Sequence, residues 1–306
     1  MDEYIGKVKM NYEYYCGEDL YSDGDIEDEL LRIVQSETDY SKIIYESASW
    51  PILYHLSDVR ENVLSWYPFK ENASVMEIGA GCGAVTGALL SKCSRVVSVD
   101  LSKRRSLINA YRHKEADNLE ILVANFQDVY NNVHEKFDYI TLIGVFEYAG
   151  LYINSDEPYS KFLNMIASLL KPDGKIIIAI ENRLGLKYFA GCKEDHLGKY
   201  YTGIEDAYSD EGVRTFSKRE LIKLFNENGF SQYEFYYPYP DYKLPEAIYS
   251  DENLPHEGEL INNMRNFDAE RYVVFDESKA FDGIIKASLF DEFSNSYIIE
   301  LSNKAE

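Results

Sequence analysis

From Ser74 onward, short apolar runs alternate with segments of helical pattern, and this alternation constrains the fold more than any other feature. The apolar runs are SVMEIG (74–79), RVVSVD (95–100), LEILVAN (119–125), FDYITLIGVF (137–146) and KIIIAI (175–180). Apolar strands separated by helices are typical of a parallel sheet that is covered on both faces. The sequence therefore predicts a doubly wound α/β fold.

The first of these strands runs into a glycine-rich loop. Gly79, Gly81 and Gly83 alternate directly after the apolar run Val75–Ile78, and a helical segment follows. Such a loop lets a ligand approach the backbone closely at the start of a helix. Because Gly79, Gly81 and Ala84 also match the dinucleotide-binding fingerprint, the loop alone leaves NAD and other adenosine-containing ligands open.

Polar residues at the strand ends bear on the choice of ligand. Asp100 ends the second strand and can accept two hydrogen bonds from a ribose diol, while Asn125 and Phe126 end the third and can flank an adenine. The carboxylate of Glu77, two residues before the first glycine, suits a ligand with positive charge. No arrangement for a pyrophosphate accompanies the loop, so these residues favour S-adenosylmethionine (SAM) over NAD.

The order of these features resembles the class I SAM-dependent methyltransferases. MEIGAGCG matches their first motif, SVD the acidic strand end, FDYITLIGVFEY the fourth strand, LLKPDGKIIIAIENR the turn before strand five, and FSNSYIIEL the last strand. The resemblance implies a Rossmann-like, seven-stranded sheet that ends in an antiparallel hairpin. It also implies SAM as the cofactor, with S-adenosylhomocysteine as product, bound by Glu77, Gly79, Ala80, Gly81, Gly83, Asp100, Leu101, Asn125, Phe126 and Gly144.

Three segments fall outside the alternation of strands and helices. Residues 1–70 are predicted to form a helical cap, and residues 71–306 the methyltransferase domain, with insertions at about 181–216 and 239–293. Insertions of this length in an α/β unit tend to be lids or binding loops. We therefore expect both to lie on the substrate side.

The charge and the apolar content exclude several classes of partner. A net charge of −22 argues against nucleic acid as acceptor, because phosphate backbones are bound by basic surfaces. No apolar run approaches the ~18 residues of a membrane span, and the sequence MDEYIGKVKM does not resemble a secretory signal. The expected location is the cytoplasm.

The sequence also predicts a metal-free enzyme. Metal-dependent O-methyltransferases have an Asp at the end of the fourth strand and an acid–Asn pair after the fifth. Glu181-Asn182 matches the second requirement, but Gly144-Val145-Phe146-Glu147 lacks the first. The same stretch lacks the Pro-Pro signature of enzymes that methylate amino groups of bases.

The segment from Glu181 to Gly203 carries the candidates for acceptor binding. It concentrates cationic side chains, among them Arg183, and Arg214 follows. In so acidic a chain these suggest an anionic acceptor group, such as a carboxylate, which needs no base and fits a guanidinium. A hydroxyl acceptor would instead require His196 or Asp195 as base. The alternative is that both arginines pair with nearby acids and that His196 and Asp195 form a surface pair.

The segments CGEDLYSDGDIED, ENRLGLKYFAG and GVRTFS are similar to enzymes of bacterial biosynthetic clusters. Those clusters make cell-surface glycans or ribosomally synthesised modified peptides such as lanthipeptides. The similarity implies either the C-terminal carboxylate of a modified peptide, oriented by Arg183, Arg214 and His196, or a sugar hydroxyl; the long insertions favour the peptide. A third interpretation is a SAM-binding partner subunit without turnover, which the intact glycine loop and Asp100 disfavour.

Overall fold

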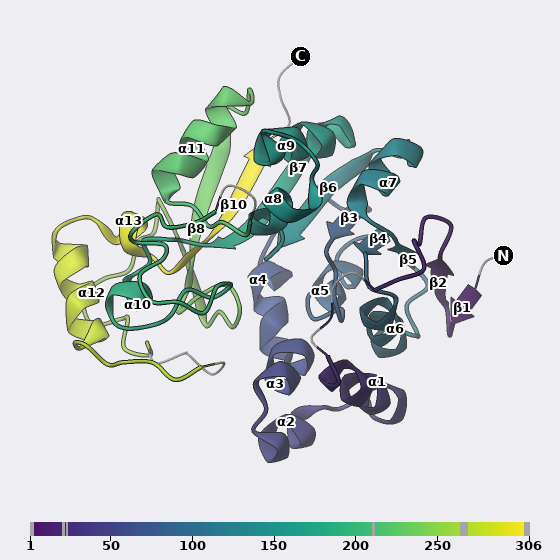
Figure 1. The fold of residues 1–306 in the computed structure, drawn as a ribbon, viewed down its shortest axis with the longest axis horizontal. Coiled ribbons are helices and arrows are strands. Elements are labelled where there is room, and N and C mark those ends of the chain that lie inside the picture. The colour runs from purple at the N-terminus through teal and green to yellow at the C-terminus, as the bar shows by residue number, and fades with distance from the viewer. Residues whose placement is uncertain (1–2, 20–21, 23, 210–211, 264–268, 303–306) are drawn as a thin grey trace. The chain divides into compact units, whose positions relative to one another are not determined.

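The computed structural model describes residues 3–19, 22, 24–209, 212–263 and 269–302. The chain divides into two compact units, one formed by residues 1–143 and 168–175, the other by residues 144–167 and 176–306. Figure 1 gives the labels of the helices and strands in both units. Each unit combines strands with helices, so the fold belongs to the α/β class, as the sequence predicted.

The first unit contains six strands within its described residues, in the order β1-β2-β5-β4-β3-β6. All neighbours pair in parallel except β1 and β2, which are antiparallel. Met76 of β3 lies opposite Val97 of β4 and Ile140 of β6, and all three side chains are buried. The strands are β1 (Glu3–Ile5), β2 (Val8–Asn11), β3 (Ser74–Ile78), β4 (Arg95–Asp100), β5 (Leu119–Val123) and β6 (Phe137–Ile143).

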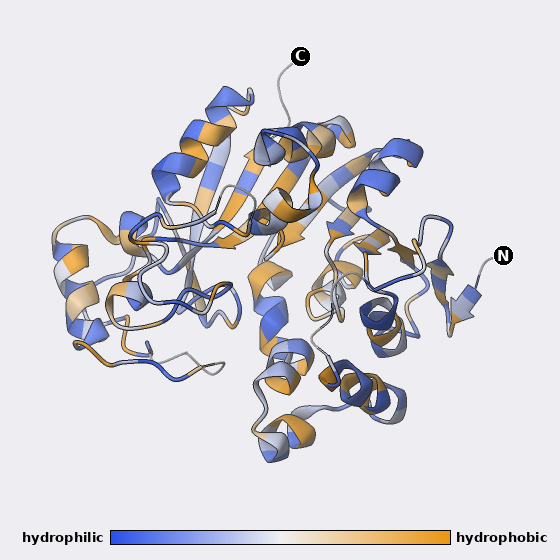
Figure 2. Cartoon of the chain, in the orientation of Figure 1, coloured by the Kyte–Doolittle hydropathy of each residue, from blue (hydrophilic) through white to orange (hydrophobic). Residues whose placement is uncertain are grey.

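The helices of the first unit cover its strands and build a second core with the N-terminal segment. Leu30 and Ile33 of the first long helix pack in one cluster with Leu56, Ile108 and Cys82, the last of which belongs to the glycine loop. The helices are α1 (Ile26–Ser36), α2 (Ser41–Ser47), α3 (Trp50–Leu56), η1 (Asp58–Glu61), α4 (Asn62–Ser65), α5 (Thr86–Leu90), α6 (Lys103–Arg112) and α7 (Phe126–Asn132). Figure 2 shows α1 with one apolar and one hydrophilic side, which fits its place beside α6.

The N-terminal helices were predicted, whereas β1 and β2 were not. Val8 and Met10 of β2 are buried and alternate with half-buried neighbours, which is the period of two that a strand requires. A run of four residues is too short for that period to stand out from its acidic, tyrosine-rich surroundings. The N-terminal segment therefore contributes strands to the sheet as well as the predicted helices.

The second unit has the strand order β7-β10-β8-β9, and β8 pairs antiparallel with both β10 and β9. β7 (Leu170–Glu181) begins in the first unit and ends in the second. It already includes Lys171–Gly174, which the sequence analysis placed in a turn. The remaining strands are β8 (Tyr233–Tyr239), β9 (Ala247–Ser250) and β10 (Ser296–Ser302).

The predicted insertions contain helices and one further strand among their described residues. Residues 181–216 hold α10 (Leu186–Phe189), and residues 239–293 hold β9, α12 (Glu277–Lys286) and α13 (Phe290–Phe293). The other helices are η2 (Phe146–Tyr148), α8 (Ala149–Tyr152), α9 (Pro158–Ser168) and α11 (Lys218–Glu227). Among the described residues, no helix is long and apolar enough to cross a membrane.

The strands that the sequence predicted are all present. The five runs of the alternation correspond to β3, β4, β5, β6 and β7. SYIIEL forms β10, and YEFYYP (233–238), the other strand of the predicted antiparallel hairpin, forms β8. The antiparallel pairing of β8 with β10 is the predicted hairpin.

Candidate functional site

The glycine loop of the first unit has a backbone that other residues would strain. Gly79, Gly81 and Gly83 have φ angles of 71°, 54° and 76°, in the left-handed region that glycine adopts freely. A Cβ on Gly83 would lie 2.4 Å from Oδ1 of Asn109. The loop therefore needs glycine both for its turn and for its close contact with α6.

Asp100 holds the glycine loop against the end of β4. Its Oδ2 accepts a hydrogen bond from the backbone N–H of Gly81 at 2.7 Å, and its Oδ1 accepts one from Ser102 at 2.9 Å. The N–H groups of Gly79 and Ala80 donate to the carbonyl of Val99. Because each carboxylate oxygen has a further lone pair, Asp100 retains capacity for a ligand hydroxyl.

Glu77 lies under the loop and is buried. Its Oε2 accepts hydrogen bonds from the hydroxyls of Thr86 and Ser98, each at 2.7 Å. Burial raises the pKa of Glu77 to about 7, against the lowering effect of these two bonds. The carboxylate thus links β3 to α5 and β4, and its contact with a cofactor stays a prediction.

The predicted adenine contacts follow β5 in the same unit. The side chain of Asn125 accepts a hydrogen bond from the N–H of Gln127 at 2.9 Å and so caps α7, whose first residue, Phe126, is buried. The N–H of Ala124 donates to the carbonyl of Asp100 at 2.9 Å. The structure therefore brings the loop, Asp100 with its half-buried neighbour Leu101, and the start of α7 together.

Gly144 belongs to the second unit, where it lies against a tyrosine. Its φ is 68°, and a Cβ there would be 2.6 Å from the hydroxyl oxygen of Tyr242. Glycine is thus required at this position by the approach of Tyr242. Its predicted contact with the methionine part of SAM remains a prediction.

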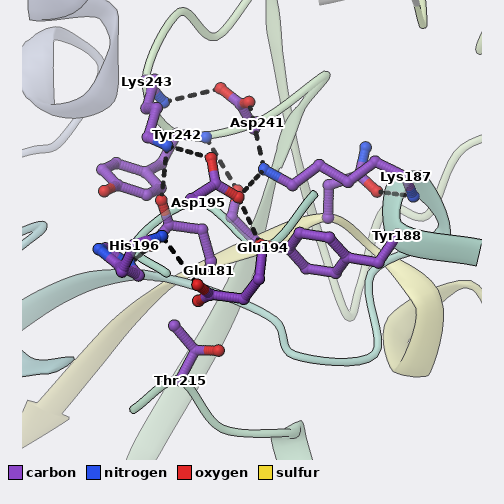
Figure 3. A network of polar contacts seen from close by, with 12 residues as sticks. Glu181, Lys187, Tyr188, Glu194, Asp195, His196, Thr215, Asp241, Tyr242 and Lys243 are labelled. Atoms are coloured by element: carbon purple, nitrogen blue, oxygen red, sulfur yellow. Dashed lines mark hydrogen bonds and ion pairs between the residues drawn. The ribbon is translucent and has the colours of Figure 1, made fainter. Parts of the chain in front are cut away.

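His196 stands between two buried glutamates in the second unit. Its Nε2 lies 3.4 Å from Oε2 of Glu181 and 3.9 Å from Oε1 of Glu147, and neither glutamate is exposed. Its Nδ1 lies 3.2 Å from the hydroxyl oxygen of Tyr148. Figure 3 shows His196 and Glu181 as part of one polar network with Asp195, Lys187 and Lys243.

The electrostatics of this cluster follow from burial and mutual charge. Burial, and next the charge of Glu181, raise the pKa of Glu147 to about 8. Burial opposes ionisation of Glu181, but Lys243 and His196 lower its pKa below the ordinary range. Burial likewise disfavours charged His196, yet the adjacent Glu181 raises its pKa to about 9. Glu147 and His196 thus hold a proton more tightly than usual, whereas Glu181 holds one less tightly.

Asp195 is surrounded by donors rather than paired with His196. Lys187 Nζ lies 2.9 Å from Oδ2 of Asp195, the hydroxyl of Tyr188 donates to the same oxygen, and Lys243 contacts Oδ1. Burial opposes its ionisation, but the two lysines hold the pKa of Asp195 well below its usual range. A carboxylate so neutralised is a poor proton acceptor, which argues against the predicted role of Asp195 as base.

The two predicted carboxylate-binding arginines share one acid. Arg183 Nε donates to Oε2 of Glu220 at 2.7 Å, and Arg214 lies 3.5 Å from Oε1 of Glu220 and 3.0 Å from Asp206. Despite burial, the bonds from Arg183 and Ser217 lower the pKa of Glu220 to about 2. The guanidinium groups thus form ion pairs within the chain, the alternative that the sequence analysis left open.

Sequence reasoning did not single out several members of the network. Glu147, Lys243 and Glu220 were not among its candidates, although they contact the predicted residues directly. A signal existed for Glu147, because an acid directly after the apolar run of β6 calls for a partner. No local signal existed for Lys243, which reaches Glu181 from a distant loop.

Comparison with known proteins decides the family. A family model described as a methyltransferase domain matches residues 53–234, more than half of the chain. The chain belongs to this methyltransferase family. It is therefore a class I SAM-dependent methyltransferase with SAM as its cofactor, and the interpretation as a subunit without turnover falls away.

This methyltransferase is distantly similar to characterised relatives. A tRNA (guanine-N(7)-)-methyltransferase of Staphylococcus haemolyticus is 26% identical over 192 residues, covering 58% of this chain and 86% of that protein. Ribosomal RNA small subunit methyltransferase A of Borrelia garinii is 20% identical over 211 residues, covering 68% and 72%. A solved SAM-dependent methyltransferase of Archaeoglobus fulgidus is 13% identical with a TM-score of 0.49, covering 86% of this chain and 100% of that one.

The residues of the first unit fit the chemistry of SAM. The buried Asp100 carboxylate has lone pairs for ribose hydroxyls, and the loop glycines carry no side chain that would keep a ligand from their backbone. SAM supplies an activated methyl group on a sulfonium. The residues that would hold it are the loop glycines, Asp100 and the start of α7.

Proposed function

We propose that this methyltransferase methylates a hydroxyl oxygen, with a sugar hydroxyl as the acceptor class. The observation that supports this is the buried cluster of Glu147, Glu181 and His196, whose ligand-type atoms lie within 4.8 Å of one another. A neutral hydroxyl is a weak nucleophile and needs help to lose its proton. A carboxylate acceptor would need no such group.

The proposed reaction transfers the methyl group of SAM to the oxygen of the acceptor hydroxyl. The acceptor hydroxyl loses its proton to solvent by way of the cluster, and a lone pair of its oxygen forms the new bond to the methyl carbon. The bond between that carbon and sulfur breaks, and its electron pair stays on sulfur. SAM thereby becomes S-adenosylhomocysteine, and the acceptor becomes a methyl ether.

Esterification of a peptide carboxylate is the alternative that the sequence favoured. It would require Arg183 or Arg214 to exchange Glu220 for the acceptor, and Glu220 also forms the cap of α11. Partners already matched in charge and geometry favour a structural role for these arginines. A place in a glycan or modified-peptide cluster rests on the sequence similarity alone.

A mass measurement tests the proposal. The full chain is incubated with SAM and, separately, nucleotide sugars and oligosaccharides, a peptide with a free C-terminus, and the same peptide amidated. We expect a gain of one methyl group on a sugar. A gain on the free peptide and not on the amidated one would overturn the proposal in favour of the carboxylate.

Two variants separate the candidate roles. We expect His196→Asn to lower kcat by roughly 100-fold or more, the range for loss of proton-transfer catalysis, with binding of S-adenosylhomocysteine unchanged. Arg183→Gln is the matched comparison and should retain kcat on the sugar. The reverse pattern would place acceptor recognition at the arginines.

A further inference from the structure

Glu147 has a buried carboxylate without a hydrogen-bonding partner. The residue is fully buried, and no other described residue donates a hydrogen bond to either carboxylate oxygen. Buried acids are normally hydrogen-bonded or closely paired, but the ring nitrogen nearest to Glu147, Nε2 of His196, lies 3.9 Å from its Oε1. The position of Glu147 therefore points to a group that is absent from the protein atoms themselves.

The surroundings of this carboxylate have the composition of a cation site. One oxygen each from Glu147 and Glu181 and a ring nitrogen of His196 lie within 4.8 Å of one another. His196 Nε2 is 3.4 Å from Oε2 of Glu181, close to the separation of two ligands about 2.1 Å from a tetrahedral ion. Small shifts of the side chains would close three ligands around one ion.

Glu181 and His196 are each held in place by a contact on the atom that faces away from the proposed cation. Lys243 Nζ contacts the opposite oxygen of Glu181, Oε1, at 2.9 Å, which leaves Oε2 toward His196. The Nδ1 of His196 lies 3.2 Å from the hydroxyl oxygen of Tyr148. If Nδ1–H donates to that oxygen, the ring is neutral and Nε2 presents a lone pair, as a metal ligand must.

The charges of the network leave room for two positive charges. Lys187 contacts Asp195 and Asp241, and Lys243 contacts Asp195 and Glu181, so these two positive charges face three carboxylates. Glu194 is stabilised separately, because its Oε2 accepts the backbone N–H groups of His196 and Leu197. With Glu147 beside His196, four carboxylates face two lysines, and a divalent cation on a neutral His196 would supply the two missing positive charges.

We propose that Glu147, Glu181 and His196 bind one divalent cation of the Mn²⁺ or Zn²⁺ class. A mixed set of imidazole and carboxylate ligands suits these ions better than Ca²⁺, which takes oxygen ligands alone. This differs from the sequence prediction of a metal-free enzyme, which found the acid–Asn pair at Glu181-Asn182 but no Asp at the end of the fourth strand. Glu147 supplies the missing carboxylate from the turn that follows that strand.

A catalytic role of the cation rests on the proposed function, but the binding of the cation is inferred independently of that function. With three protein ligands, an open position remains for the acceptor hydroxyl. A bound cation would lower the pKa of that hydroxyl, whose proton would leave to water; the oxygen would then bond to the methyl carbon of SAM as the carbon–sulfur bond breaks. The cation is neither oxidised nor reduced.

Binding is tested on the full chain without any acceptor. After treatment with EDTA and removal of the chelator, the protein is titrated with Mn²⁺, and free Mn²⁺ is followed by electron paramagnetic resonance; Zn²⁺ uptake is measured by native mass spectrometry. We expect one ion per chain and at least a tenfold loss of affinity in Glu147→Gln. Glu277→Gln removes another buried carboxylate, paired with Arg271 in the same unit, and should bind the ion as the wild type does.

The outcomes distinguish this inference from the proposed function. Absence of an ion in the wild type, or equal affinity in Glu147→Gln, would overturn the cation site even if sugars are methylated. Binding that depends on Glu147 supports the site even if every sugar fails as acceptor. His196→Ala provides a second test, because it should lose the ion in a chain that circular dichroism shows to be folded.

Discussion

Gly83 shows at the level of a single residue how closely the loop is fitted to its helix. Its φ of 76° disfavours any side chain, and Asn109 of α6 occupies the space that a Cβ would need. Glycine is therefore a requirement of the fold here, independent of any ligand. Substitution should affect both stability and cofactor binding.

We expect Gly83→Ala to destabilise the chain by at least about 1–2 kcal/mol, the penalty for a left-handed residue with a Cβ. Binding of S-adenosylhomocysteine should also weaken, because the loop must shift away from Asn109. Chemical denaturation and calorimetry measure the two effects.

Gly283→Ala is the matched control: nothing lies within 4 Å of its Cβ position in α12, so it should be neutral or stabilising by up to about 1 kcal/mol. Equal stability of the two variants would contradict the account of the loop.

Glu77 should make stability depend on pH. Its pKa of about 7 in the folded chain exceeds the ordinary value of 4.5 for a glutamate, so the folded state holds the proton more tightly and stability falls as pH rises between these values. At 1.36 kcal/mol per pKa unit, the wild type should lose about 2 kcal/mol more than Glu77→Gln between pH 5 and pH 8. Urea denaturation of both proteins across this range gives the difference. Parallel curves would show that Glu77 titrates normally.

At the scale of elements, α11 ties two parts of the second unit together. The Ser217 N–H donates to Oε2 of Glu220 at 2.8 Å, and the same oxygen accepts from Arg183. The start of the helix thereby orders the segment that follows β7. This junction explains why the arginines are not free to serve an acceptor.

We expect Ser217→Ala to destabilise the chain by about 1 kcal/mol, a typical loss for an N-cap, while methyl transfer persists. Urea denaturation with an activity assay checks both. The control is Ser231→Ala, an exposed serine outside any helix or strand, which should change neither. A large loss of activity in Ser217→Ala would show that the Arg183 region takes part in the reaction.

Features that depend on neighbouring residues in the sequence could be predicted, whereas those that depend on contacts between distant residues could not. β3 to β7 were predictable because each is an apolar run, and the loop glycines because their spacing is local. The environment of His196 was not, since Glu147 and Tyr148 come from η2 and Glu181 from the end of β7, both far from His196 in the sequence. Asp195 illustrates the limit: its neighbour in sequence is His196, but its partners are Lys187, Lys243 and Tyr188.

At the scale of the whole molecule, the net charge limits which classes of partner can bind. Its net charge of −22 opposes the approach of any polyanion. Two of its relatives are named for tRNA and ribosomal RNA. From its charge we expect this chain to use a different class of acceptor.

We expect no binding of tRNA or of ribosomal RNA fragments in a gel-shift assay, even at 50 mM salt, where electrostatic binding is strongest, and no methyl transfer to either. Binding of S-adenosylhomocysteine in the same preparation serves as the control for folding. Binding of RNA that weakens with added salt would show a basic surface hidden within the acidic total.

The short strands β1 and β2 carry one more consequence. β2 pairs with the outer side of β5, from Lys9 opposite Glu120 to Asn11 opposite Leu122, and β1 adds only three residues beyond it. Without them, β5 would present a row of unpaired backbone groups to the strands of other copies. Residues 3–11 thus protect the edge of β5 from pairing with strands of other copies. Their loss would expose this edge and favour aggregation through strand pairing.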